Sequence, residues 1–268
     1  MKRRFIFLAF YLIVCANFLF AQEDLSSIPK IFYRNEKTIS LNFSTNSWGL
    51  GYRYGSRINY FEKRLYEVEF SNIKHSKEIK STSTFLSPES FVFGKLHSVY
   101  DLRFSYGKQN ELYGKKDKGS VAIRYFYSVG PSIAFLKPIY YKINHLVNDT
   151  IQISEEKFNP DIHTSDRISG KASYFKGFDE MKIVPGVFIK LGINFEFSQS
   201  DVVVHALEAG AMFQAYTNSL ELMAVDDNQQ FFFTLFICYR IGKIVNAQEI
   251  SDEYFKKRKK GIRIFNRD

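Results

Sequence analysis

FFFTLFICYRIGK, residues 231–243, places an apolar side chain at every second position. Successive side chains of a β-strand point to opposite faces, so a period of two indicates a strand with one apolar face. Arg240 falls on the other face of this strand. We predict that the alternating apolar residues face outward, towards lipid: Phe231, Phe233, Leu235, Ile237, Tyr239 and Ile241.

Residues 182–197 repeat this pattern with Val187, Ile189, Leu191, Ile193, Phe195 and Phe197. Six further segments alternate less strictly, and the eight expected strands are 38–45, 48–57, 64–74, 92–107, 119–136, 182–197, 202–216 and 230–243. The predicted fold is all-β: a transmembrane antiparallel up-and-down β-barrel of eight strands, with ten as the alternative.

The first residues of the chain resemble a cleavable signal peptide. Lys2, Arg3 and Arg4 precede an apolar run that ends near Ala21, before the polar Gln22. The later apolar segments alternate, and none is the continuous run of about 20 residues that a membrane helix requires. We therefore expect an exported protein in the outer membrane of a Gram-negative bacterium, with a signal peptide at 1–21, a periplasmic segment at 22–37, the barrel at 38–243 and a periplasmic tail at 244–268.

The composition of the 268-residue chain agrees with a barrel. Aromatic residues make up 17% of it, with 28 Phe and 17 Tyr, and a barrel places such residues against lipid and at the two membrane interfaces. Of the two cysteines, Cys15 lies in the expected signal peptide, so Cys238 has no partner for a disulfide in the mature chain.

The lengths of the connections give the expected orientation. With the N-terminus in the periplasm, odd-numbered connections lie outside the cell and even-numbered ones form the usually shorter periplasmic turns. Only the first hairpin, at residues 46–47, is an unexpectedly short outer connection. The long extracellular loop 137–181 contains IYYKIN and TIQISEE, which predict either a projecting hairpin or two more barrel strands.

The alternation also selects the residues that face the barrel interior. An eight-stranded barrel is barely wide enough for its own side chains, and charges inside it must be paired. We therefore expect a plugged lumen that is filled by a network of ion pairs. The predicted members of this network are Arg53, Glu67, Glu69, Asp101, Arg103, Arg124, Lys190, Glu196, Glu208 and Arg240, and Arg57 is predicted on the same inward face.

No HExxH, GxSxG or P-loop motif occurs in the chain. The most suggestive local group is NPDIHTSD, whose Asp161, His163, Ser165 and Asp166 could serve as metal ligands or hydrolase parts on the outer face. A turn rich in hydrogen-bonding side chains explains the same residues and is the favoured interpretation. We expect no catalytic residues, no cofactor and no metal.

Two other segments stand out for their composition. FKGFDEMK, residues 175–182, places aromatic side chains beside a glycine and charges, which favours packing at the barrel mouth, with ligand contact as the alternative. The tail contains Lys256, Lys257, Arg258, Lys259 and Lys260. Export makes nucleic acid an unsuitable partner, so an anionic lipid surface or an envelope protein is expected to bind the tail, unless it is simply solvated.

As a set, TNSWGLGYRYG, NIKHSKEIK, YFYSVGPSIAFLKPIYY, FKGFDEMKIVPG, LGINFEF, ALEAGAMFQAY and FFFTLFICYRIGK resemble an uncharacterised outer-membrane β-barrel family of Bacteroidota-type bacteria. The resemblance covers roughly residues 38–243 and implies the barrel fold, without an activity or catalytic residues. The chain differs from ordinary outer-membrane proteins in continuing beyond its last strand.

Three functions are compatible with these features. The expected one is a non-enzymatic structural or accessory subunit of an envelope assembly, for secretion or outer-membrane biogenesis. The alternatives are a barrel enzyme acting on lipid or envelope substrates at the outer rim, and a small-solute porin, which the paired charges of the lumen disfavour.

Overall fold

The computed structural model describes residues 34–59, 61–82, 89–115, 119–147, 150–198, 202–224 and 228–246. All of these belong to the compact unit Tyr33–Asp268, and the unit Met1–Phe32 lies outside them. The predicted signal peptide and the basic residues of the tail also lie outside the described residues. No helix in the described part of the chain is long and apolar enough to cross a membrane.

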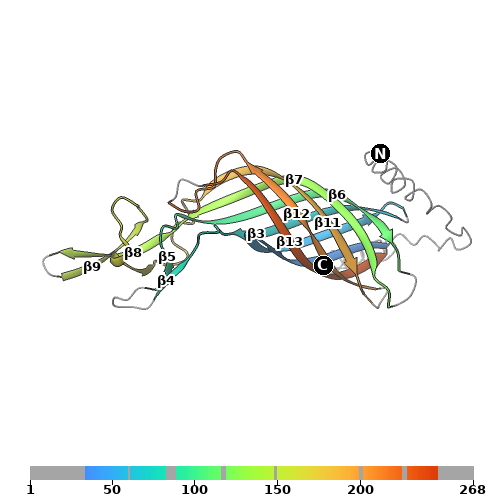
Figure 1. The fold of residues 1–268 in the computed structure, drawn as a ribbon, viewed down its shortest axis with the longest axis horizontal. Helices are drawn as coiled ribbons and strands as arrows, with labels where there is room; N and C mark the ends of the chain where they lie inside the picture. The colour runs from blue at the N-terminus through green and yellow to red at the C-terminus, as the bar shows by residue number, and fades with distance from the viewer. Residues whose placement is uncertain are drawn as a thin grey trace, which may run out of the picture. The chain divides into compact units, whose positions relative to one another are not determined.

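Eight strands of the described chain form a closed antiparallel barrel, which confirms the predicted fold class (Figure 1). Around the barrel they follow the order β1, β13, β12, β11, β7, β6, β3, β2. Strand β1 pairs with β13 from Arg34 opposite Asn246 to Ser44 opposite Phe236, and this seam closes the barrel. The strands are β1 (Arg34–Ser44), β2 (Ser47–Arg57), β3 (Glu62–Ile73), β6 (His97–Tyr113), β7 (Ala122–Pro138), β11 (Lys182–Glu196), β12 (Val203–Tyr216) and β13 (Phe231–Asn246).

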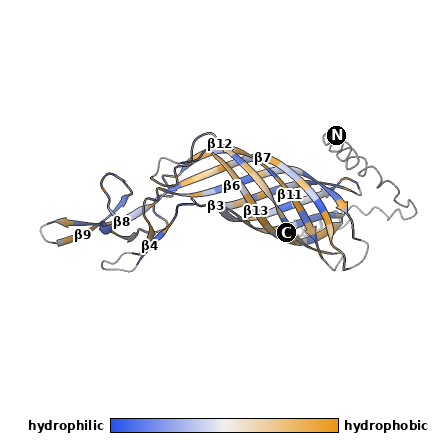
Figure 2. Ribbon diagram, viewed as in Figure 1, coloured by the Kyte–Doolittle hydropathy of each residue, from blue (hydrophilic) through white to orange (hydrophobic). Residues whose placement is uncertain are grey.

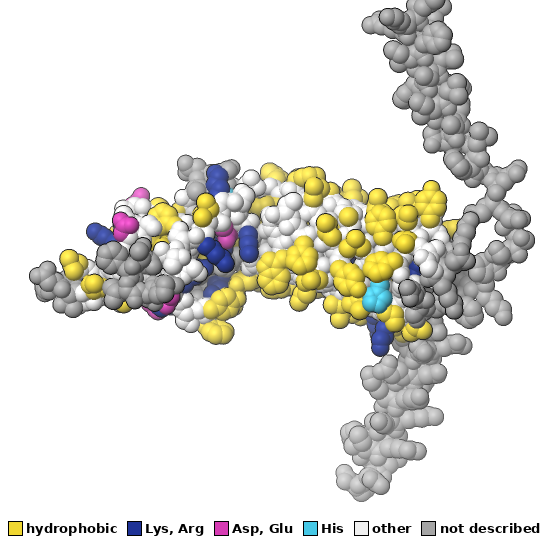
Figure 3. Space-filling model, turned by 60° about the horizontal axis from the view of Figure 1, so that its bottom comes forward, with side chains coloured by type: hydrophobic (Ala, Val, Ile, Leu, Met, Phe, Trp, Pro, Cys, Tyr) yellow, Lys and Arg dark blue, Asp and Glu magenta, His cyan; other side chains and the backbone are white. Residues whose placement is uncertain are grey.

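Each strand alternates between the two faces of the wall (Figure 2). In β13 all six predicted outward residues are exposed, whereas Phe232, Thr234, Phe236, Cys238 and Arg240 between them are buried. Hydrophobic side chains accordingly cover much of the barrel surface that Figure 3 shows. A wall that is apolar outside and polar inside is what a barrel surrounded by lipid requires.

The predicted limits of several strands differ from the structure: β1 begins at Arg34, four residues earlier than expected, and β7 begins at Ala122, three residues later. Strand β6 begins at His97 rather than at residue 92, because a turn at 93–94, with Gly94 at a φ of 76°, interrupts the chain first. The same strand continues to Tyr113, six residues beyond its predicted end. The connection between β6 and β7 is therefore 114–121. The predicted strands had left a longer connection, 108–118.

The two ends of the barrel differ in their connections. Residues 58–61, 114–121 and 197–202 form short connections at one end, which by the usual architecture faces the periplasm. At the other end the connection at 45–46 is short, as predicted, but 74–96, 139–181 and 217–230 are long. We name the first end periplasmic and the second end extracellular, after the orientation that the sequence predicts.

The long connections fold into additional β-structure, which we call the extension. Its strands are β4 (Lys80–Thr82), β5 (Ser90–Val92), β8 (Tyr140–Val147), β9 (Thr150–Lys157) and β10 (Ile168–Lys171), with the 3-10 turn η1 at Ser165–Arg167. Strand β8 pairs with β9 and β10, and none of the three joins the barrel sheet. The alternative of ten barrel strands was therefore wrong, and residues 137–181 instead contain a projecting hairpin.

The extension has a hydrophobic core of its own. Phe91, Tyr141, Ile143, Phe158 and Ile168 are buried together there. The Tyr141 hydroxyl lies 2.7 Å from the carbonyl oxygen of Val92 and 2.9 Å from that of Lys95. Burial raises the pKa of the Tyr141 hydroxyl, which therefore keeps its proton and donates to these carbonyls.

Candidate functional site

The lumen of the barrel contains most of the buried charged side chains of the described chain. All ten charged residues predicted to form its network, from Arg53 to Arg240, are buried, and each takes part in an ion pair. Arg57 is only half-buried, and its guanidinium lies 3.9 Å from Glu111 at the periplasmic rim. These residues occupy successive levels of the lumen.

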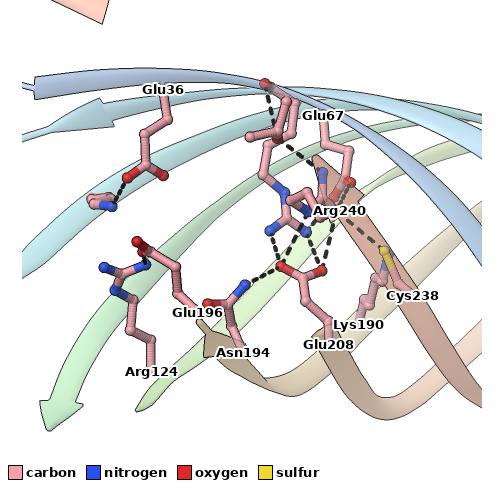
Figure 4. Close-up of polar contacts among 12 residues, drawn as sticks. Glu36, Glu67, Arg124, Lys190, Asn194, Glu196, Glu208, Cys238 and Arg240 are labelled. Carbon is pink, nitrogen blue, oxygen red and sulfur yellow. Dashed lines mark hydrogen bonds and ion pairs between the residues drawn. The ribbon is translucent and has the colours of Figure 1, made fainter. Parts of the chain in front are cut away.

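The centre of the lumen holds two arginines and two glutamates that share their bonds (Figure 4). Arg53 is 2.8 Å from Glu67 and 2.5 Å from Glu208, while Arg240 is 2.6 Å from Glu67 and 3.1 Å from Glu208. The amide of Asn194 donates a further hydrogen bond of 2.8 Å to Glu208. Their side chains are at most 4% exposed, so each charge is neutralised within the protein.

A second group of charges lies nearer the extracellular side. Arg103 pairs with Glu69 at 3.3 Å and with Asp101 at 3.5 Å, and it donates to the Ser71 hydroxyl at 3.0 Å. Lys190 pairs with the same Glu69. Arg103 also lies over the Phe188 ring, 5.9 Å from its centroid, so apolar side chains fill the space between the ionic groups.

The periplasmic end contains a third group. Arg124 pairs with Glu196 and, at 3.3 Å, with Glu111. Lys115 pairs with Glu196 at 2.8 Å and also donates to Ser198. The alternation had identified Arg124 and Glu196, but Glu111 lay beyond the predicted end of β6, and Lys115 lies in the connection that follows this strand.

The ion pair of the buried Lys63 with the half-buried Glu36 was also missed. Both residues stand just before the predicted starts of their strands. Lys63 is two residues before the inward Leu65, so extending the same alternation by one step would have found it.

The extracellular mouth is closed by an apolar cluster that we call the plug. Strand residues such as Ile73, Val99 and Leu136 form its wall. The long connections supply the side chains that fill it: Val92, Leu220, Leu222 and Met223, all buried.

Backbone hydrogen bonds hold these connections in place. The amide groups of Leu96 and His97 donate to the Leu222 carbonyl at 2.9 and 3.3 Å. The side-chain oxygen of Asn228 accepts from the Leu222 amide at 3.1 Å. Sequence alternation could not reveal the plug, because its filling residues lie in loops without periodicity.

The candidate cluster in the 139–181 connection has a different arrangement. His163 is buried, whereas Asp161, Ser165 and Asp166 are exposed. The amide of Asn159 donates to His163 Nδ1 at 3.1 Å, so Nε2 carries the proton and donates to Glu156 at 3.2 Å. Both ring nitrogens are therefore engaged by other residues of the extension.

Two other observations bear on this cluster. The Asp161 amide donates to the side chain of Asn159, as in an Asx turn. Within the described ranges no group of three or more His, Cys, Asp and Glu side chains is arranged to hold a metal ion. The geometry favours the structural interpretation of NPDIHTSD.

Comparison with known proteins gives similarity only at the level of a small barrel. No known protein family matches this sequence, and no curated protein matches it. The crystal structure of Neisserial surface protein A is similar to this chain: the alignment covers 80% of this chain and 97% of that protein, with 7% sequence identity and a TM-score of 0.38.

Two further solved barrels are similar to the chain in the same way. Ail of Yersinia pestis, solved with a heparin analogue, covers 80% of this chain over 100% of its own, with 6% identity and a TM-score of 0.37. The alignment with the N-terminal barrel of Pseudomonas aeruginosa OprF covers 78% of this chain and 98% of that barrel, with 8% sequence identity and a TM-score of 0.32. The assignment of the fold rests on the strand order of the chain itself.

Proposed function

We propose that this chain is an outer-membrane barrel without a conducting pore, which serves as a structural or accessory component of the cell envelope. The observation that carries the proposal is the filled lumen: three groups of paired charges lie below an apolar plug. The extension, with its own core, is the part that the barrel would hold outside the cell. Resemblance of the strand motifs alone supports a source among Bacteroidota-type bacteria.

The lumen argues against the porin alternative. An ion crossing it would have to separate Arg53 and Arg240 from the two glutamates that they share, and then pass through the plug. Breaking buried pairs and wetting an apolar cluster are both costly. Both ring nitrogens of His163 are hydrogen-bonded to Asn159 and Glu156, so the geometry of this cluster does not support the enzyme alternative.

Planar-bilayer recordings on the purified barrel test the closed lumen. We expect no stable conductance steps, while a porin reconstituted in the same bilayers should give them. Reproducible steps of constant size from this protein would overturn the proposal.

The accessory role needs a separate test. A photo-crosslinking residue at Ile153, which is exposed on β9, should capture an envelope protein in intact cells, and the same residue at Leu235 on the barrel wall should not. A barrel that purifies alone from native membranes, without crosslinks from either position, would argue against an assembly.

The tail extends this proposal to the periplasmic side. We propose that its basic residues, Lys256 to Lys260, bind an anionic lipid surface or an envelope partner. Deleting 251–268 should leave barrel insertion intact and weaken retention at low salt more than at high salt. Unchanged retention at every ionic strength would mean that the tail is only solvated.

A further inference from the structure

Three aromatic side chains gather at the base of the extension. Tyr174, Phe175 and Phe178 contact one another, with ring centroids 5.7, 5.7 and 6.4 Å apart. They are 58%, 79% and 40% exposed, respectively. Gly177, at a φ of 86°, forms the turn between them, 3.0 Å from the Pro138 carbonyl where a Cβ would sit. Such a cluster of exposed rings requires an explanation.

The cluster continues the lipid-facing wall of the barrel. Tyr100 lies on the outward face of β6, and its hydroxyl is 2.7 Å from the Tyr174 hydroxyl. The Tyr100 ring stacks on Phe70 of β3, with centroids 5.9 Å apart and planes inclined by 7°. Phe70 is an exposed outward residue of the barrel. An unbroken strip of rings therefore runs from the barrel wall onto the extension.

Two lysine side chains lie next to the aromatic cluster. Lys137, on the outward face of β7, lies beneath the rings, with its ammonium 4.3 Å from the Tyr174 centroid and 4.7 Å from that of Phe178. The same ammonium donates to the Tyr174 carbonyl. Lys176, between the aromatic residues, turns to Glu155 of β9 at 2.7 Å. The segment thus directs Lys176 towards the extension, while its rings cover the ammonium of Lys137.

We propose that residues 174–178 are an interfacial anchor, whose rings insert into the outer leaflet of the membrane at the boundary between headgroups and acyl chains. The inference rests on the proposed membrane location of the barrel and adds a second contact with lipid. A lipid surface is favoured as the occupant because the rings are continuous with the wall that already faces lipid. Tyrosine rings with Lys stems beside them suit this depth, where one end is apolar and the other hydrated.

The chain contains a single tryptophan, Trp48, so fluorescence can locate the cluster. In a Trp48→Phe background, Phe175→Trp would be compared with Leu146→Trp at an exposed position of β8 and with Leu235→Trp on the barrel wall. Each protein would be reconstituted in phosphatidylcholine and phosphatidylglycerol vesicles. Lipids with a shallow or a deep doxyl group and aqueous iodide would serve as quenchers.

We expect Phe175→Trp to be quenched most by the shallow doxyl lipid and little by iodide, with a blue-shifted emission. Leu146→Trp should be quenched by iodide alone and Leu235→Trp by the deep doxyl lipid. If Phe175→Trp behaves like Leu146→Trp, or is shielded from both kinds of quencher as at a protein interface, the anchor is wrong. If Leu235→Trp itself escapes the doxyl lipids, the membrane location fails instead, so the two failures are distinguishable.

Discussion

The plug and the central charge group fill the same lumen by opposite means. The plug excludes water with apolar side chains such as Leu222, whereas the centre neutralises Arg53 and Arg240 with two shared glutamates. Apolar packing tolerates small changes of shape, but a buried charge that loses its partner strongly destabilises the folded state. The extracellular end can therefore be remodelled by its loops, while the centre depends on every member.

The largest expected effect comes from breaking the centre. Glu208→Ala removes a carboxylate shared by Arg53 and Arg240 and should destabilise the barrel by about 3 to 5 kcal/mol. Urea unfolding in detergent micelles measures this change. Glu155→Ala, which removes only an exposed pair with Lys176, is the control. Equal unfolding midpoints for the two variants would contradict the importance of the central group.

The register of the strands decides which side chains face the lumen and which face lipid. Leu235→Arg places a charge on the outward face of β13 and should cost about 2 to 4 kcal/mol near the membrane midplane. Lys190→Leu, on the inward face, serves as the contrasting variant. A slip of one residue would exchange the two faces, so that Lys190 would face lipid and Leu235 the lumen. A gain of stability in Lys190→Leu together with an unchanged stability of Leu235→Arg would therefore refute the register.

A smaller loss is expected in the plug. Leu222→Ala should cost about 2 kcal/mol, at the lower end for a buried leucine, because a loop can settle into the cavity. Leu235→Ala on the lipid face should change stability less. Unfolding curves of the two variants test the difference, and a plug variant as damaging as Glu208→Ala would remove the contrast between the two regions.

The bond that ties the extension to the plug should matter less still. Tyr141→Phe removes a hydroxyl that donates to the carbonyls of Val92, a plug residue, and Lys95, at a cost of about 1 kcal/mol. Hydrogen exchange should become faster in residues 89–96 and stay unchanged in β13. Faster exchange throughout the barrel would show that the two regions unfold as one unit.

The smallest effect should be confined to the extension. Hydrogen bonds from Ser154 and then His145 lower the pKa of Glu156 from 4.5, so its stabilising contribution is complete above about pH 4.5 and is lost as the pH falls through the lowered pKa. Hydrogen exchange of residues 150–163 in acid, corrected for intrinsic rates, should therefore accelerate, and Glu156→Gln should abolish that dependence. An acid response that persists in this variant would point to another group.

The sequence predicted the barrel and its charges well, because both follow from alternation along strands. Glu208 and Arg240 occupy inward positions of regular strands, so counting in twos was enough to bring them together. Leu222 and Tyr174 have no such period, since loops bring them into place. The plug and the anchor therefore depend on packing between segments distant in sequence, which a local pattern does not contain.

The seam between β1 and β13 has a consequence for the order of folding. It joins Arg34 to Asn246, the first and the last of the described residues, whereas the neighbouring hairpins join residues close in sequence. Contacts of long sequence separation form late because their loop-closure entropy must be overcome first. An unfinished barrel would thus carry two unpaired edges until its last strand arrives, and in that interval it would need protection from aggregation.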